Sequence, residues 1–200
     1  MFPEDNPSLE VGEVFDRLIE NYQEPHRRYH TAEHLYACFR VLDDFYPEAN
    51  LPIQFALWFH DVVYDTHSDE NEEKSGEIAL EELDRLGLEP FNVYDLILAT
   101  KHDGPPHGEE AKIVVDVDLS ILGETPDAYR QYEQQIRQEY EWVPEKVFWA
   151  YRRSLLKQFM DGDWIFYTEP LRRSDYERRA WLNLAGSVGA GRESSPQPAP

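Results

Sequence analysis

The chain of 200 residues contains a single cysteine, Cys38. One cysteine excludes an intramolecular disulfide, so nothing in the sequence indicates an oxidising compartment. No apolar run approaches the roughly 20 residues that span a bilayer, and residues 1–20 lack the basic and apolar regions of a signal peptide. The sequence therefore predicts a cytoplasmic protein with no membrane partner.

Positive charge is scarce. The 19 Lys and Arg residues stand against 40 Asp and Glu residues, which gives a formal net charge of −21. Because binding to a phosphate backbone needs a basic surface that displaces counterions, we expect no nucleic-acid partner. Two interpretations of the acidity stay open: an adaptation to high salt, or simply an acidic surface. In either case a local cation or arginine cluster would have to offset the repulsion of an anionic substrate.

The hydrophobic fraction of 41%, with 14% aromatic residues, is sufficient for a folded core. A chain of this length fits one domain, which we place at residues 1–186. Residues 187–200 are small, polar and rich in proline, and they have no periodicity, so we predict a disordered C-terminal tail there.

Apolar residues recur at three- and four-residue spacing along most of the chain, which is typical of amphipathic helices. Thr31 is predicted to cap a helix that Pro47 ends, and Pro52 to open a helix that reaches His60. Residues 113–117 are β-branched and could form a strand, but a single strand has no partner, so we assign them to a buried helix. The predicted fold class is all-α, with a single helical bundle.

The candidate functional residues are histidines and acids in three parts of the chain: His30 and His34, the adjacent pair His60 and Asp61, and Asp118. The apolar run of residues 55–59 precedes the adjacent pair, so a buried segment is expected to deliver both side chains to the interior. Burying them without partners would be costly, and a metal ion is an efficient partner. Imidazole nitrogen and carboxylate oxygen suit Mn, Mg, Fe, Co, Ni or Zn rather than a metal that seeks thiolates.

The same segments resemble the HD superfamily of metal-dependent phosphohydrolases, and most closely a bacterial branch of small predicted HD hydrolases. The resemblance covers most of residues 20–185, and these segments carry it: residues 27–34, 56–64, 71–75, 97–102, 116–123, 136–140 and 183–184. It implies an HD-like helical bundle with a metal site in its core, with these ligands: His34, His60, Asp61 and Asp118. It also implies attack of metal-activated water on a small phosphoester, such as a nucleotide or related metabolite, with Asp61 orienting the nucleophile. The motif does not distinguish a monoester from a diester.

His30 resembles the histidine that protonates the leaving oxygen in HD-fold cyclic phosphodiesterases, and an imidazole titrates in a suitable range. A structural role for His30 stays equally open. Arg28 is a candidate phosphate ligand, whereas for Arg27 the alternative of a surface arginine is at least as good. His102 is expected to face the site and to bind substrate phosphate or a second metal. Further substrate-binding candidates are Lys101, Asp65 and Glu72.

Three other functions remain open. The chain could be a catalytically degenerate module that binds a metal or a nucleotide, or an HD-fold di-iron oxygenase, for which only His102 is well placed as an extra ligand. Residues 30–34 also satisfy the H-x-x-E-H pattern of inverted zinc proteases. That chemistry needs both histidines on one helical face, and an N-cap at Thr31 would leave His30 outside the helix. A homodimer is compatible with the sequence.

Overall fold

The computed structural model describes residues 7–189, without the side chains of residues 7–11; residues 1–6 and 190–200 lie outside the described part. The structure is all-α as predicted, and no strand occurs between residues 7 and 189. The chain divides into two compact units, residues 1–118 and 119–200, and the predicted domain over residues 1–186 covers both. The last helix runs to Gly189, three residues beyond the predicted boundary, and the remainder of the predicted tail lies outside the described residues.

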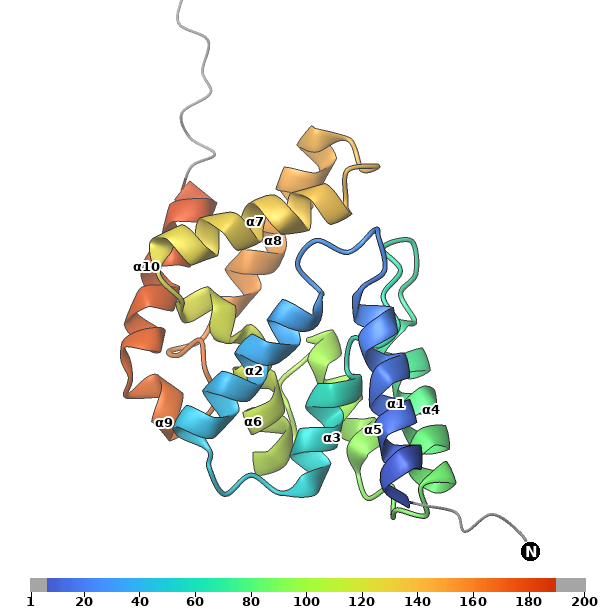
Figure 1. Cartoon of the computed structure of the whole chain (residues 1–200). Coiled ribbons are helices and arrows are strands. Elements are labelled where there is room, and N and C mark those ends of the chain that lie inside the picture. The colour runs from blue at the N-terminus through green and yellow to red at the C-terminus, as the bar shows by residue number, and fades with distance from the viewer. Residues whose placement is uncertain (1–6, 190–200) are drawn as a thin grey trace, which may run out of the picture. The chain divides into compact units, whose positions relative to one another are not determined.

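The first unit consists, in its described part, of these helices: α1 (Pro7–Tyr22), α2 (Ala32–Phe45), α3 (Leu51–Phe59), α4 (Asn71–Arg85), α5 (Val93–Leu98), the 3-10 helix η1 (Ala99–Lys101) and α6 (Glu109–Asp118). Helix α3 lies at its centre and packs against α2, α4, α5 and α6 (Figure 1). Its only polar side chain is Gln54, which suits a helix covered on several sides. The end of α3 is therefore a buried position.

Local sequence explains where α2 and α3 begin. The Thr31 hydroxyl accepts a hydrogen bond from the Glu33 backbone N–H, and the Asn50 side chain accepts one from the Ile53 N–H. Each bond satisfies a donor that the first helical turn leaves free. The predicted cap at Thr31 and the helix opened by Pro52 are thus confirmed. Residues 113–117 lie in α6, which confirms their assignment to a helix.

The second unit is built around its last helix. Its described elements are the 3-10 helix η2 (Leu119–Gly123), α7 (Pro126–Glu139), α8 (Glu145–Phe159), α9 (Glu169–Arg172) and α10 (Asp175–Gly189). Helix α10 packs against η2, α7, α8 and α9 (Figure 1). A buried ion pair, Arg152–Glu133 at 2.7 Å, joins α8 to α7. Among residues 7–189, no helix has the length and apolar character needed to cross a membrane.

Gly123 allows η2 to approach α10 very closely. A Cβ atom at position 123 would lie 2.6 Å from the backbone oxygen of Tyr176, a distance that real Cβ contacts do not reach. Two hydrogen bonds hold the contact: Arg179 Nε donates to the Gly123 carbonyl at 2.6 Å, and Asn183 Nδ2 donates to the Leu122 carbonyl at 2.9 Å. The packing of α10 thus depends on the absence of a side chain at one position.

Candidate metal centre

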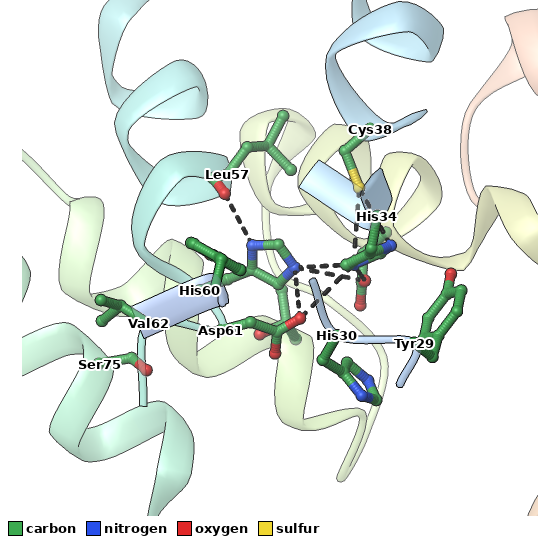
Figure 2. Close-up of polar contacts among 12 residues, drawn as sticks. Tyr29, His30, His34, Cys38, Leu57, His60, Asp61, Val62 and Ser75 are labelled. Carbon is green, nitrogen blue, oxygen red and sulfur yellow. Dashed lines mark hydrogen bonds and ion pairs between the residues drawn. The ribbon is translucent and has the colours of Figure 1, made fainter. Parts of the chain in front are cut away.

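Three helices of the first unit deliver the predicted ligands to one point (Figure 2). His34 lies inside α2, His60 caps the C-terminus of α3 with Asp61 next to it, and Asp118 is the last residue of α6. Because α3 packs against both α2 and α6, their polar side chains meet in the interior. His34 and His60 are only 4% and 1% exposed, so their ring nitrogens must find partners among protein groups or a bound ion.

The facing atoms of the four side chains have the spacing of a coordination shell. The two histidine Nε2 atoms are 3.1 Å apart. His34 Nε2 lies 3.5 Å from Asp61 Oδ2 and 3.2 Å from Asp118 Oδ1, and the corresponding distances from His60 Nε2 are 3.1 and 3.6 Å. Ligand atoms bound to one cation at about 2.0–2.2 Å, with angles of about 90–109°, are separated by about 2.8–3.6 Å. The measured distances fit this range.

The chemistry of the donors fits a divalent cation as well. His60 Nδ1 lies 2.8 Å from the Leu57 carbonyl oxygen, which can only accept, so Nδ1 carries a hydrogen. In the neutral ring the lone pair is then on Nε2, which faces the cluster, and the hydrogen bond fixes the ring as outer partners of metal-binding histidines do. Asp61 Oδ2 is buried and accepts no hydrogen bond within the described structure. A cation would satisfy both atoms.

The charges of the cluster are tightly coupled. Burial by itself raises the pKa of Asp61, but nearby His60 and His30 outweigh burial and hold that pKa well below its usual range. Burial also opposes ionisation of Asp118, yet hydrogen bonds from the neighbouring histidines lower its pKa. For His60, burial lowers the pKa, and the two carboxylates overcome this and raise it. The raised pKa of His60 and the lowered pKa values of the two carboxylates thus share one cause, their mutual attraction, which a cation between them would also provide.

Arg27 is a buried support for this site and not a surface arginine, which corrects the alternative kept open for it. Its side chain is fully buried, and its guanidinium donates to the backbone carbonyls of His30, Asp61 and Val62 at 3.1, 2.7 and 3.0 Å. These bonds tie the segment before α2 to the segment after α3. Arg28, in contrast, is exposed, and it lines a pocket of about 350 Å³ beside Thr31 and Glu33 at the start of α2.

His30 lies beside the cluster but outside α2 (Figure 2). Its half-buried ring stacks on that of Tyr64, with centroids 4.0 Å apart, and its centroid is 5.9 Å from that of His34. Because His30 precedes the helix and Glu33 is exposed, the two histidines and the glutamate do not share a helical face. This arrangement contradicts the inverted zinc-protease geometry.

The other candidates divide into two groups. His102 lies at the site as expected, in a left-handed conformation after η1, and its Nε2 is 3.0 Å from Asp118 Oδ2. Glu72 is half-buried; burial and the charge of Asp61 both raise its pKa. Lys101 instead pairs with Glu73 at 2.6 Å, and Asp65 accepts from the His67 backbone N–H in an exposed loop. Within residues 7–189, the hydrogen bonds of Lys101 and Asp65 are made to residues other than the predicted metal ligands, and their assignment as substrate-binding residues stays a prediction.

Cys38 is the residue that sequence reasoning missed. Its sulfur lies 3.7 Å from His34 Nε2, and one ligand-type atom from each of His34, Cys38, His60 and Asp118 falls within 4.8 Å of the others. The sequence pattern favoured a shell of nitrogen and oxygen alone. A signal was present, because Cys38 follows His34 by four residues in a predicted helix and therefore shares its face.

Comparisons with protein-family models, with curated proteins and with solved structures find no match. The resemblance to the HD superfamily therefore depends on the chain's own motifs, and the site on its own geometry.

Proposed function

We propose that the protein is a cytoplasmic, metal-dependent phosphohydrolase of the HD superfamily, acting on a small phosphoester such as a nucleotide or related metabolite. The observation that carries the proposal is the convergence of His34, His60, Asp61 and Asp118, whose facing atoms lie 3.1–3.6 Å apart. The order of these residues along the chain supports the choice of phosphoester chemistry. His34 and His60 are buried, and the Oδ2 atom of Asp61 accepts no hydrogen bond in the described structure. Both observations support a bound divalent cation.

A bound divalent cation supplies a water of lowered pKa and neutralises charge on a phosphoryl oxygen. The protein's own groups perform the remaining tasks. The Leu57 carbonyl orients the His60 ring, and Arg27 fixes the backbone of Asp61 through its carbonyl. Asp61 would ligate the cation and would accept a hydrogen bond from the attacking water. We assign to His30 the role of protonating the leaving oxygen, and to Arg28 a contact with the phosphate.

A screen of metals against substrates tests this function. The chelated protein is supplied with Mn, Mg, Fe, Co, Ni or Zn and assayed against nucleotides and generic phosphoesters. Turnover should require metal, and Asp61→Ala should abolish it, because a ligand and the water's hydrogen-bond acceptor disappear together. Asp84→Ala, which removes an exposed carboxylate of α4, is the matched control and should keep full activity. Activity that survives in Asp61→Ala would refute the proposal, and metal binding without turnover would favour a degenerate module.

The role of His30 has its own test. His30→Ala should keep the metal content and lower kcat by about 10²–10⁴-fold, the usual scale of general acid catalysis. The loss should be smaller for an aryl phosphate, because a good leaving group needs little protonation. Equal losses on good and poor leaving groups would show that His30 only positions the substrate. Loss of metal from the variant would make His30 a ligand.

A further inference from the structure

We propose that Cys38 donates a thiolate to the metal centre, so that the site takes zinc, cobalt or iron in preference to magnesium. The inference rests on the proposed metal centre and adds a donor that the HD-like ligand set does not contain. On binding, the S–H bond of Cys38 breaks, an S–metal bond forms, and the proton leaves to solvent.

The position of Cys38 on α2 brings its sulfur to the cluster. Cys38 lies one helical turn after His34, so both side chains project from the same face (Figure 2). The sulfur is 3.7 Å from His34 Nε2 and 3.8 Å from Nδ1. A thiolate bound at about 2.3 Å and an imidazole nitrogen bound at about 2.1 Å lie about 3.6 Å apart at a tetrahedral angle. The observed separation from Nε2 is close to that value, whereas the nearly equal distance from Nδ1 places the sulfur over the ring, so the thiol must turn toward the Nε2 side to share a cation with it.

The surroundings of the thiol favour a ligand over a packing role. Cys38 is only 1% exposed, and its described polar contacts are both with the ring of His34. Independently, the buried Oδ2 atom of Asp61 accepts no hydrogen bond and faces the same two histidines. One ligand-type atom from each of His34, Cys38, His60 and Asp118 thus lies within 4.8 Å of the others, in the same cluster as this unsatisfied acceptor.

The donor set determines which metal fits. Magnesium prefers an octahedron of oxygen atoms and keeps several waters, whereas thiolate and imidazole together suit zinc, cobalt and iron. A site in which the Cys38 thiolate joins the imidazoles of His34 and His60 is therefore poorly suited to magnesium. The sulfur-free set of His34, His60, Asp61 and Asp118 would discriminate much less.

Cobalt absorption spectroscopy tests the thiolate directly. The full-length protein is stripped with a chelator and titrated with Co²⁺. Because Cys38 is the only cysteine of the chain, a thiolate-to-cobalt charge-transfer band in the near ultraviolet can come from no other residue. We expect the band in the native protein and its loss in Cys38→Ser and Cys38→Ala, with weaker visible bands showing that cobalt is still held. Circular dichroism and thermal unfolding establish that both variants are folded.

Zinc and magnesium titrations give the second readout. Outer-shell substitutions already cost about 10–100-fold in metal affinity, so loss of a direct ligand should weaken zinc binding at least about tenfold. Magnesium affinity should be unchanged in both variants. Cobalt bound to the native protein without the charge-transfer band would overturn the thiolate and leave the metal centre intact. If the native protein binds neither cobalt nor zinc more tightly than His34→Ala does, the metal centre itself is refuted.

Discussion

His60 has contacts at both ring nitrogens, and this makes it the residue at which a proton and the proposed metal would compete. Nδ1 donates to the Leu57 carbonyl, while Nε2 faces His34 and the carboxylates of Asp61 and Asp118. The carboxylates raise the pKa of His60 despite its burial. A cation at Nε2 would take over the charge neutralisation that the proton provides.

The stability of the chelated protein should therefore depend on pH in two directions. The pKa of His60 is raised in the folded state, so its contribution is fully present below about pH 6.5 and is lost as pH rises through the folded value. The pKa values of Asp61 and Asp118 are lowered, so their contribution is present above about pH 3.9 and is lost as pH falls. The thermal midpoint of the chelated protein should therefore be highest between about pH 3.9 and pH 6.5 and should decrease at lower and at higher pH.

Zinc provides the control for that experiment. With saturating zinc the loss above about pH 6.5 should disappear, because the cation replaces the proton between histidines and carboxylates. A chelated protein whose thermal midpoint keeps rising above that pH would contradict the coupling inferred for His60.

Two adjacent arginines offer a matched pair for the support of the site. Arg27→Lys keeps the charge but loses the planar fork that reaches three backbone carbonyls, so the free energy of unfolding should fall by about 2–4 kcal/mol. Arg28→Lys, at an exposed position, should change it by no more than about 0.5 kcal/mol. Urea denaturation measures both values. Similar losses in the two variants would show that the buried hydrogen bonds of Arg27 contribute little.

Residue types, together with the resemblance to the HD superfamily, predicted His34, His60, Asp61 and Asp118 as ligands, and the structure brings these four side chains together. The same reasoning could not assign Arg27 or Cys38. A buried arginine differs from a surface arginine only by what surrounds it. The sequence does not show that the backbone carbonyls of residues 61 and 62 would lie next to Arg27. A lone cysteine can be recognised as a candidate metal ligand only when the fold brings ligands from other helices close to it.

At the scale of helices, periodicity and capping predicted most elements of the fold. Thr31, Asn50 and Pro52 define the starts of α2 and α3 through local hydrogen bonds and a fixed backbone angle. Lack of a pairing partner was sufficient to place residues 113–117 in α6. The approach of η2 to α10 was not predictable, because it depends on which segments meet across the second unit and not on either segment alone.

Alanine substitutions at two glycines of the second unit test the effects of close packing and of helix propensity separately. Gly123→Ala should lower the free energy of unfolding by about 1–3 kcal/mol, because its Cβ would collide with the backbone of Tyr176. Gly186→Ala, at an exposed position of α10 with no atom near the added Cβ, should be neutral or stabilise by up to about 1 kcal/mol. Chemical denaturation distinguishes them. A tolerated Gly123→Ala would mean that η2 can move away from α10 at little cost.

At the scale of the whole molecule, the net charge of −21 is a repulsive term that salt can screen. The screening length falls from about 30 Å at 0.01 M to about 3 Å at 1 M salt, so the thermal midpoint should rise over this range of sodium chloride. Sucrose, which stabilises by exclusion without screening, is the control. A rise that continues to several molar salt would favour adaptation to high salt, and one that is complete at low ionic strength would favour a plain acidic surface. A midpoint that does not rise would contradict the repulsion.

The positions of the ligands also have a consequence for local motion. His34, His60 and Asp118 belong to helices that are far apart in the sequence, yet their side chains meet at one point. A cation held there would tie the opening of α2, α3 and α6 together, since none could separate without releasing a ligand. Deuterium exchange at their backbone amides would then slow in all three helices at once and would occur as a single cooperative event. The contacts among α2, α3 and α6 join distant parts of the chain and therefore cost much chain entropy to form. With the cation bound, they would be the last contacts to open.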